Sequence, residues 1–180
     1  MVVCRTSHPG DFSPLKRYRP IIDDWGAFWQ SLSRPLPAAV WTNTLKTRPE
    51  RLAGLLPADG IPLQPLPWRP GGFKLLVQDT KPGKHWGFLG GLYHVQEEVS
   101  LLPVLLLDPR PGDRVLDLCA APGNKTAQIA VAMGNHGTVV ANDRDFNRIR
   151  AIHHITERLG ILNTCTTLCD GANYPKAAGL

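Results

Sequence analysis

Three aspartates stand where short apolar segments end, and their positions give the first indication of chemistry in this chain. Asp117 lies inside an apolar run, while Asp143, 26 residues later, and Asp170 each follow one. A carboxylate inside an apolar run is costly unless it has a partner. An acid at the tip of the second strand of an α/β sheet is where a nucleotide ribose is held. The pattern predicts a ligand site that uses carboxylates as hydrogen-bond acceptors.

Small residues fill the turn that follows the first of these aspartates: Ala120, Ala121, Pro122 and Gly123. Small side chains allow a ligand to approach the backbone, proline fixes φ, and Gly123 tolerates angles that other residues resist. The alternative is an ordinary strand-to-helix connection with small residues for packing. The turn is not a dinucleotide fingerprint, because that motif needs three spaced glycines and only Gly123 is present.

A helix is expected directly after this turn, opened by Asn124, Lys125 and Thr126. Its first N–H groups would point back across the turn, and a helix N-terminus of this kind attracts a carboxylate or a phosphate. Lys125 would add positive charge there or extend to solvent.

Regular alternation of strand and helix patterns must position these residues. Strands are expected at 115–118, 138–142 and 164–169, with helices at 126–133 and 146–159 that each end before a glycine. Every connection is too long for a hairpin, which predicts a parallel sheet with right-handed crossovers. Ligands of such sheets bind beyond the carboxyl ends of the strands, where the three aspartates lie.

The earlier part of the chain has a less regular pattern. Residues 1–20 lack periodicity and are interpreted as a disordered lead-in. A short helix capped by Asp23 or Asp24 is expected next, and core packing is favoured over base stacking for its aromatic residues. These aromatic residues are Trp25, Phe28 and Trp29.

A small strand–helix–strand module is expected between residues 38 and 80, its helix starting with Thr47 as the cap and Pro49 in the first turn. The segment 96–107 is expected to be an apolar helix that Pro103 kinks or divides.

Composition limits the classes of protein that the chain can belong to. It is 43% hydrophobic and 19% charged, which is typical of a chain that folds, and it has no apolar segment long enough for a membrane span. The net charge of +5 lies mostly before residue 113, where 13 basic residues face nine acidic ones. A basic surface suits nucleic acid, although a plain basic surface explains this modest excess equally well. The four cysteines indicate neither a disulfide framework nor a metal site.

The run Asp-Leu-Cys-Ala-Ala-Pro-Gly-Asn-Lys-Thr, residues 117–126, resembles the cofactor-binding motif of the RNA cytosine-5 methyltransferases of the Sun/Nop2 family. Flanking segments agree with that family, and the likeness extends from about residue 36 to residue 170. These flanking segments are Tyr93 to Ser100, Asp108 to Asp113, Asp143-Arg144 and Arg158-Leu159-Gly160.

The resemblance implies an α/β fold: the N-terminal half of a Rossmann-like, S-adenosylmethionine-dependent methyltransferase sheet, preceded by a small α/β RNA-binding module. We therefore expect the module at residues 21–90 and an incomplete methyltransferase domain at 91–180. Five basic residues of the module are candidates for a phosphate path, although each taken singly is more often a solvated charge. They are Lys46, Arg48, Arg51, Lys81 and Lys84.

S-adenosyl-L-methionine is the cofactor that the resemblance implies. The carboxylate of the cofactor would meet the N–H groups from Gly123 to Lys125, Asp143 would accept the ribose hydroxyls, and Asp170 would accept the adenine amine. Asp117 is expected to brace the turn by accepting backbone N–H groups. The predicted cofactor-binding residues are Cys119, Ala120, Ala121, Pro122, Gly123, Asn124, Lys125, Asp143 and Asp170.

The family methylates C5 of cytosine through a cysteine thiolate, which the resemblance places in a Pro-Cys motif after a fourth strand. No cysteine here follows a proline, so no catalytic residue is assigned and the nucleophile is expected beyond Leu180. We expect a truncated family member that is inactive alone. The alternatives are a noncatalytic RNA-binding protein that keeps the cofactor fold, a methyltransferase that acts on protein or small molecules, and a nucleotide-dependent oxidoreductase with a divergent turn. The missing glycines weigh against the oxidoreductase.

Ribosomal RNA is the preferred partner, because Val40 to Leu45 and Tyr93 to Ser100 look most like the bacterial ribosomal enzymes. Transfer RNA stays open. We also expect a cytoplasmic protein that is monomeric at full length and that binds neither a membrane nor a metal.

Overall fold

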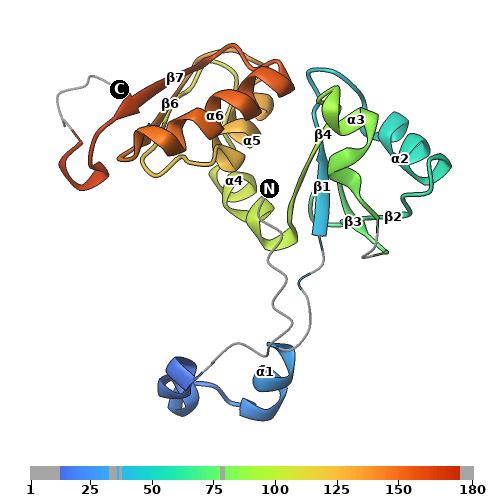
Figure 1. Cartoon of the computed structure of the whole chain (residues 1–180), viewed down its shortest axis with the longest axis vertical. Helices are drawn as coiled ribbons and strands as arrows, with labels where there is room; N and C mark the ends of the chain where they lie inside the picture. The colour runs from blue at the N-terminus through green and yellow to red at the C-terminus, as the bar shows by residue number, and fades with distance from the viewer. Residues whose placement is uncertain (1–12, 33–35, 37, 78–79, 175–180) are drawn as a thin grey trace. The chain divides into compact units, whose positions relative to one another are not determined.

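The computed structural model describes residues 13–32, 36, 38–77 and 80–174, and it divides into two compact units, residues 1–36 and residues 37–180 (Figure 1). In the first unit a 3-10 helix, η1 (Ser13–Ile21), precedes α1 (Trp25–Ser31). The predicted lead-in therefore divides: residues 1–12 lie outside the described residues and 13–20 lie in η1. Of the two caps considered for α1, the cap is Asp24, whose side chain accepts the Ala27 N–H at 2.8 Å.

An antiparallel sheet forms the first part of the second unit, in the order β2 (Leu63–Pro65), β3 (Gly72–Leu75), β1 (Ala38–Thr42), β4 (Tyr93–Glu97). Side chains along β1 alternate between two cores, as the pleat of a strand requires. Val40 packs with residues of α2 (Pro49–Ala58). Ala39 and Trp41 belong to a second core, which also contains residues of the helix that follows the small-residue turn at 120–123.

The apolar segment expected as one helix is three elements: the end of β4, a 3-10 turn η3 (Glu98–Leu101), and α4 (Leu102–Leu107). The prediction that a helix begins at Gln96 is wrong, since Gln96 pairs with Ala39 in the sheet. Pro103 does divide the segment, because it stands in the first turn of α4, where its missing N–H has no intrahelical acceptor. Likewise the cap of α2 is Arg48 rather than Thr47.

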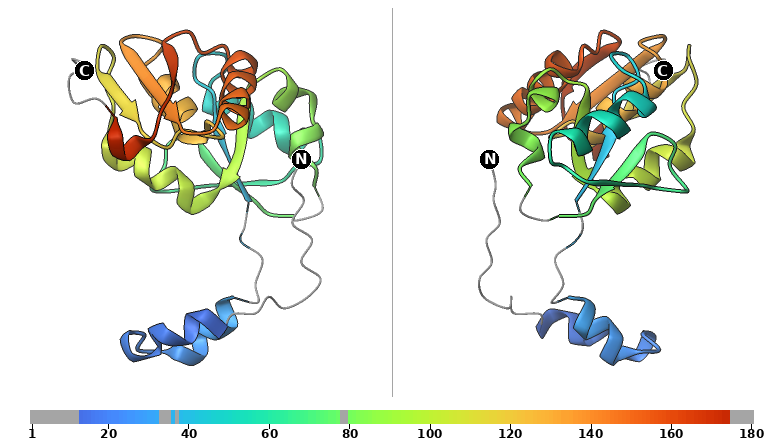
Figure 2. Two further views of the ribbon diagram at one scale, coloured as in Figure 1. Left: turned by 60° about the vertical axis from the view of Figure 1, so that its left-hand side comes forward. Right: turned by 90° about the vertical axis from the view of Figure 1, so that its right-hand side faces the viewer.

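A parallel sheet in the order β5–β6–β7 follows, as predicted (Figure 2). Its strands are β5 (Arg114–Asp117), β6 (Thr138–Asp143) and β7 (Thr164–Leu168), joined by α5 (Asn124–Ala132) and α6 (Phe146–Leu159). Its core contains buried residues that include Ala127, Ala130 and Val139. This α/β fold with a parallel sheet confirms the predicted fold class.

Shorter helices complete the unit: η2 (Pro82–Lys84), α3 (Trp86–Leu89) and η4 (Gly171–Asn173). The expected domain boundary between residues 90 and 91 falls just before β4, within the second unit, and it stays a prediction. Among the described residues no helix combines the length and apolar character that a bilayer crossing requires.

Candidate functional site

The turn between β5 and α5 is built from buried alanines and one glycine in the left-handed region. Ala120 and Ala121 are buried, and the Ala120 N–H donates to the Asn142 carbonyl at 2.8 Å. Gly123 has φ +107°, and a Cβ there would stand 3.0 Å from the Cα of Ile152 in α6. Both observations explain the glycine, since other residues resist this φ and the helix leaves no space for a side chain.

The first turn of α5 has an N-terminus that no side chain caps, with Gly123 at the N-cap position. Lys125 is exposed, while Asn124 is half-buried. Asp117 does brace this turn, but through the Thr126 hydroxyl, which donates to its Oδ2 at 2.7 Å, rather than through backbone N–H groups.

Asp143 is 2% exposed and holds the turn from the neighbouring strand. Its carboxylate accepts the Ala121 N–H at 3.2 Å and the Asp145 N–H at 3.1 Å. Arg148, whose side chain is half-exposed, lies 3.5 Å from the same carboxylate and donates to the Ala121 carbonyl at 3.0 Å. Asp143 therefore links α6, β6 and the turn.

Asn142 joins the ends of all three parallel strands, a role that sequence reasoning missed. Its side-chain amide donates to the carbonyls of Leu118 and Cys169 at 3.0 and 2.9 Å, and its Oδ1 accepts the Thr167 hydroxyl at 2.9 Å. The residue is fully buried. Its position directly before Asp143 was the available signal, because a buried amide beside a strand end must find partners.

Asp170 is exposed and follows β7, where it caps η4 by accepting the Ala172 N–H at 3.0 Å. Gly171 lies against the end of β5, since a Cβ on it would come within 3.2 Å of the Leu118 carbonyl oxygen. The structure thus gathers the predicted residues at one edge of the sheet, including the exposed Cys119. We call Asp117, Asn142, Asp143, Cys169 and Asp170 the strand-tip cluster.

Exposed apolar side chains accompany the strand-tip cluster. Leu118 and Leu168 at the strand ends are 40% and 54% exposed, and Phe146 at the start of α6 is 66% exposed. Apolar groups beside hydrogen-bond acceptors are typical of a site for a flat aromatic ligand. Within the ranges that the structure describes, no three His, Cys, Asp or Glu side chains are grouped as metal ligands.

A second set of hydrogen-bonded residues joins the antiparallel sheet to α5 and α6. Asn43 donates to the carbonyls of Gly91 and Leu159, both at 2.8 Å. His94 contacts Asn124 and Arg158 through its two ring nitrogens. We call Asn43, Lys46, Gly91, His94 and Arg158 the sheet–helix joint.

Lys46 differs from the other residues of the expected phosphate path. Its ammonium donates to the carbonyls of Gly90 and Arg158 at 3.1 and 2.8 Å, so it belongs to the sheet–helix joint. The other four residues of that expectation, Arg48, Arg51, Lys81 and Lys84, are exposed.

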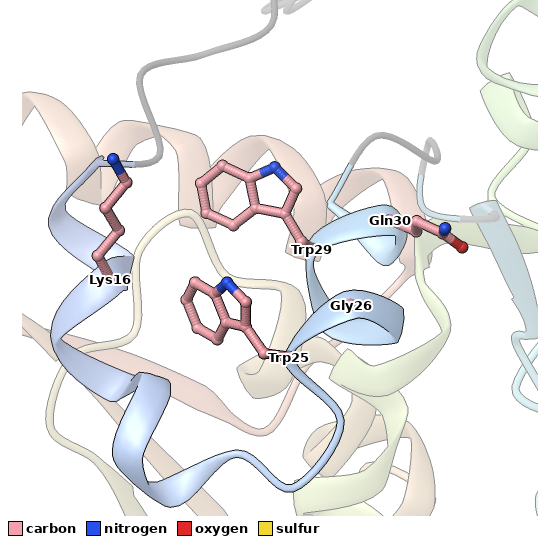
Figure 3. A pocket seen from close by; sticks show the side chains of 5 residues that line it. All are labelled: Lys16, Trp25, Gly26, Trp29 and Gln30. Carbon is pink, nitrogen blue, oxygen red and sulfur yellow. The ribbon is translucent and has the colours of Figure 1, made fainter.

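The N-terminal unit has a hollow of about 360 Å³ lined by Lys16, Trp25, Gly26, Trp29 and Gln30. Figure 3 shows both indole rings projecting from α1 toward η1, which carries Lys16. The ring centroids of Trp25 and Trp29 are 5.5 Å apart. Within this unit α1 buries none of its residues, so the core expected for its aromatic residues is not formed there.

Two family models match the chain. The model described as 16S rRNA methyltransferase RsmB/F matches residues 104–180, and the model of the N-terminal domain of 16S rRNA methyltransferase RsmF matches residues 13–98. Together they include both the strand-tip cluster and the sheet–helix joint.

Two curated relatives have different RNA substrates in their names. A 28S rRNA (cytosine-C(5))-methyltransferase of Mus musculus is 39% identical over 84% of this chain and 19% of the relative. A tRNA (cytosine(49)-C(5))-methyltransferase of Pyrococcus abyssi is 36% identical over 90% of this chain and 52% of the relative. The chain thus spans between about a fifth and about a half of the length of these relatives.

A solved structure has the same fold. The crystal structure of a methyltransferase homolog protein from Pyrococcus horikoshii superposes with a TM-score of 0.74 at 36% sequence identity, covering 78% of this chain and 46% of that chain.

Proposed function

This chain belongs to the RsmB/F, or Sun/Nop2, family of RNA cytosine-5 methyltransferases, and on that premise we propose that it supplies the part of such an enzyme that binds S-adenosyl-L-methionine. The observation that carries the proposal is the uncapped N-terminus of α5, placed beside a buried carboxylate at the neighbouring strand tip. The first offers N–H donors to an anion and the second offers acceptors to hydroxyl groups.

The residues of the turn fit the methionine end of the donor. The Gly123 N–H already donates to the Ala120 carbonyl at 2.7 Å, so the N–H groups of Asn124 and Lys125 would bind the carboxylate, and the exposed Lys125 would add charge. The buried alanines Ala120 and Ala121 keep side chains out of this path. When bound, the donor supplies a methyl group on a sulfonium, which is electrophilic.

The strand-tip cluster fits the nucleoside end. A carboxylate offers about four lone-pair positions, and at Asp143 two of them are used by backbone N–H groups. Arg148 Nη1 lies 3.5 Å from Asp143 Oδ1, and because the arginine side chain is half-exposed, a ribose hydroxyl would take its place beside the carboxylate. Asp170 would accept the adenine amine, and the exposed Leu118 and Leu168 would contact the base.

The substrate that we propose is cytosine C5 of RNA, with ribosomal RNA preferred. Both family models are described for 16S rRNA enzymes, and the mouse relative is a 28S rRNA enzyme, whereas the archaeal relative acts on transfer RNA. A cytoplasmic location and a monomeric full-length enzyme complete this proposal. Filter binding of a ribosomal RNA fragment and of transfer RNA, each over a salt series, distinguishes the two substrates.

The chain by itself would bind the donor without transferring its methyl group. Its four cysteines have no preceding proline, and the Cys169 thiol donates to Asn142 Oδ1 at 3.2 Å. A thiol held in this way, with no adjacent base in the described contacts, is not set up as a nucleophile. Formation of 5-methylcytosine in RNA by this polypeptide and S-adenosylmethionine would contradict this part of the proposal.

Titration calorimetry with S-adenosylmethionine tests donor binding directly. We expect the chain to bind the donor, and Asp143→Ala to weaken binding by at least about thirtyfold because it removes the acceptor and loosens Ala121. Arg150→Ala, an exposed position on α6, is the matched control and should leave affinity unchanged. No heat of binding from the folded chain, or equal affinity after Asp143→Ala, would contradict the proposal.

A further inference from the structure

His94 lies on β4 with its imidazole buried between α5 and α6. The residue is 6% exposed. Its Nε2 is 3.0 Å from Oδ1 of Asn124, the first residue of α5, and its Nδ1 is 2.6 Å from a guanidinium nitrogen of Arg158. One side chain of the antiparallel sheet thus reaches the residue directly after Gly123.

The two contacts determine which ring nitrogen carries the proton. A guanidinium has only donors, so Nδ1 must accept from Arg158 and is unprotonated. The proton of the neutral ring is therefore on Nε2, which donates to the Asn124 side chain. Burial lowers the pKa of His94 to about 4, which keeps the ring in this neutral form near pH 7.

Arg158 is itself fixed, so the imidazole has a defined orientation. Its guanidinium donates to the carbonyls of Phe88 and Tyr93 at 2.6 and 3.3 Å and lies 3.9 Å over the Phe88 ring. The chain of contacts runs from the last turn of α6 through His94 to the first turn of α5.

We infer that His94 is a positioning residue for the methyl donor: it holds Asn124 and thereby fixes the first-turn N–H groups of α5 that would meet the donor's carboxylate. The inference rests on the proposed function. It makes the antiparallel sheet part of donor binding, although none of its strands lies at the strand-tip cluster. N–H groups that are already held in place bind the methyl donor more strongly, because less conformational freedom is lost when the complex forms.

General packing of β4 on α5 is the competing explanation, and the same strand offers a control for it. Gln96, two residues further on the same face of β4, contacts Gln128, which is one turn further along α5, at 2.9 Å. Gln96 is 7% exposed, so its burial matches that of His94. Only the His94 contact adjoins the turn.

The test measures S-adenosylmethionine affinity by titration calorimetry on this chain, with circular dichroism and thermal melts to follow folding. His94→Leu removes both contacts, whereas His94→Gln keeps an acceptor for Arg158 and a donor for Asn124. Gln96→Leu is the packing control. Asn124→Ala and the double variant with His94→Leu show whether His94 acts through Asn124.

We expect His94→Leu to weaken donor binding by about tenfold, and His94→Gln to restore most of it. Gln96→Leu should lower the melting temperature and leave affinity within about twofold, since its contact lies away from the turn. His94→Leu should have no further effect in the Asn124→Ala background. If His94→Leu does not fold, Asn124→Ala tests the same hydrogen bond from its other partner, which is only half-buried.

Three results would overturn the inference: unchanged affinity in His94→Leu or Asn124→Ala, an equal loss in Gln96→Leu, or additive losses in the double variant. No donor binding by the unsubstituted chain would instead overturn the proposed function, and this inference with it.

Discussion

The strand-tip cluster and the sheet–helix joint each combine buried polar residues with an exposed one, Asp170 and Lys46 respectively, but they are built in different ways. At the strand tips, side chains bind backbone groups of adjacent parallel strands, as Asn142 does with Leu118 and Cys169. At the joint, side chains bind carbonyls of segments far apart in the sequence, as Asn43 does with Gly91 and Leu159.

The difference shows what each kind of sheet provides. A parallel sheet collects its strand ends at one edge, so polar groups meet there without further arrangement and can receive a ligand. An antiparallel sheet has no such edge, and its polar side chains here attach the sheet to helices. We therefore expect the joint, apart from His94, to respond mainly in stability, and the tips in both stability and donor binding.

The largest effect is expected at the joint. Gly91→Ala would place a Cβ 2.0 Å from the Arg158 carbonyl oxygen, at a residue with φ +72°. Backbone cannot move aside as a side chain can, so we expect a loss of at least about 4 kcal/mol in the free energy of unfolding, or no folding. Urea denaturation measures this.

Gly54→Ala in α2 is the matched control for that substitution, because nothing lies within 4 Å of the added Cβ. It should stabilise the chain by up to about 1 kcal/mol. Equal stability of Gly91→Ala and the unsubstituted chain would contradict the expectation that the joint responds in stability.

The strand tips come next. Asn142 is fully buried, and Asn142→Leu removes the hydrogen-bond partner of the Leu118 and Cys169 carbonyls and of the Thr167 hydroxyl. We expect a loss of about 3 kcal/mol in the free energy of unfolding, and weaker donor binding as well.

Thr167→Val is the graded control at the strand tips, because it removes only one of these hydrogen bonds. It should cost about 1 kcal/mol in the same urea experiment. If the two substitutions cost the same, Asn142 does not join the strands as its contacts indicate.

Acid should act on the joint through His94. Burial lowers the pKa of His94 from 6.5 to about 4, while its bond to Asn124 opposes this and Arg158 adds to it. The unfolded chain then binds a proton that the folded chain does not, so stability is complete above pH 6.5 and declines as the pH falls toward 4.

This decline should amount to about 2 kcal/mol between pH 6.5 and pH 4.5, measured by urea denaturation at each pH. His94→Gln has no titrating ring and should show a flatter profile. Parallel profiles for the two proteins would assign the acid sensitivity to other groups.

The smallest effect is expected at the exposed margin of the joint. Lys46→Met removes two hydrogen bonds to the carbonyls of Gly90 and Arg158 and should lower the free energy of unfolding by about 1 kcal/mol. Lys84→Met, also exposed, should stay within about 0.5 kcal/mol in stability. A larger loss for Lys84→Met in a thermal melt would contradict this distinction.

Much of the parallel sheet could be predicted from the sequence, because its signals are local. The strands at Arg114–Asp117, Thr138–Asp143 and Thr164–Leu168, and the two helices between them, lie within a few residues of their predicted positions. Short apolar runs mark the strands, apolar periodicity and terminating glycines mark the two helices, and the gathering of the aspartates follows from the rule for parallel strands.

The antiparallel part was predicted less well. The helix expected from Gln96 is a strand there because Gln96 pairs with Ala39, a residue 57 positions earlier in the chain. A short apolar run has no local feature that separates a buried strand from a helix, so its partner decides.

The sequence by itself determined the small-residue turn, the order of strands and helices around it, and the family, because each depends on residue types at short spacing. Only the tertiary structure decided that Asn142 joins three strands, that Lys46 serves the joint, and that His94 holds Asn124. These side chains bind partners distant in the sequence, and which groups a buried donor or acceptor meets is settled only when the sheets and helices pack.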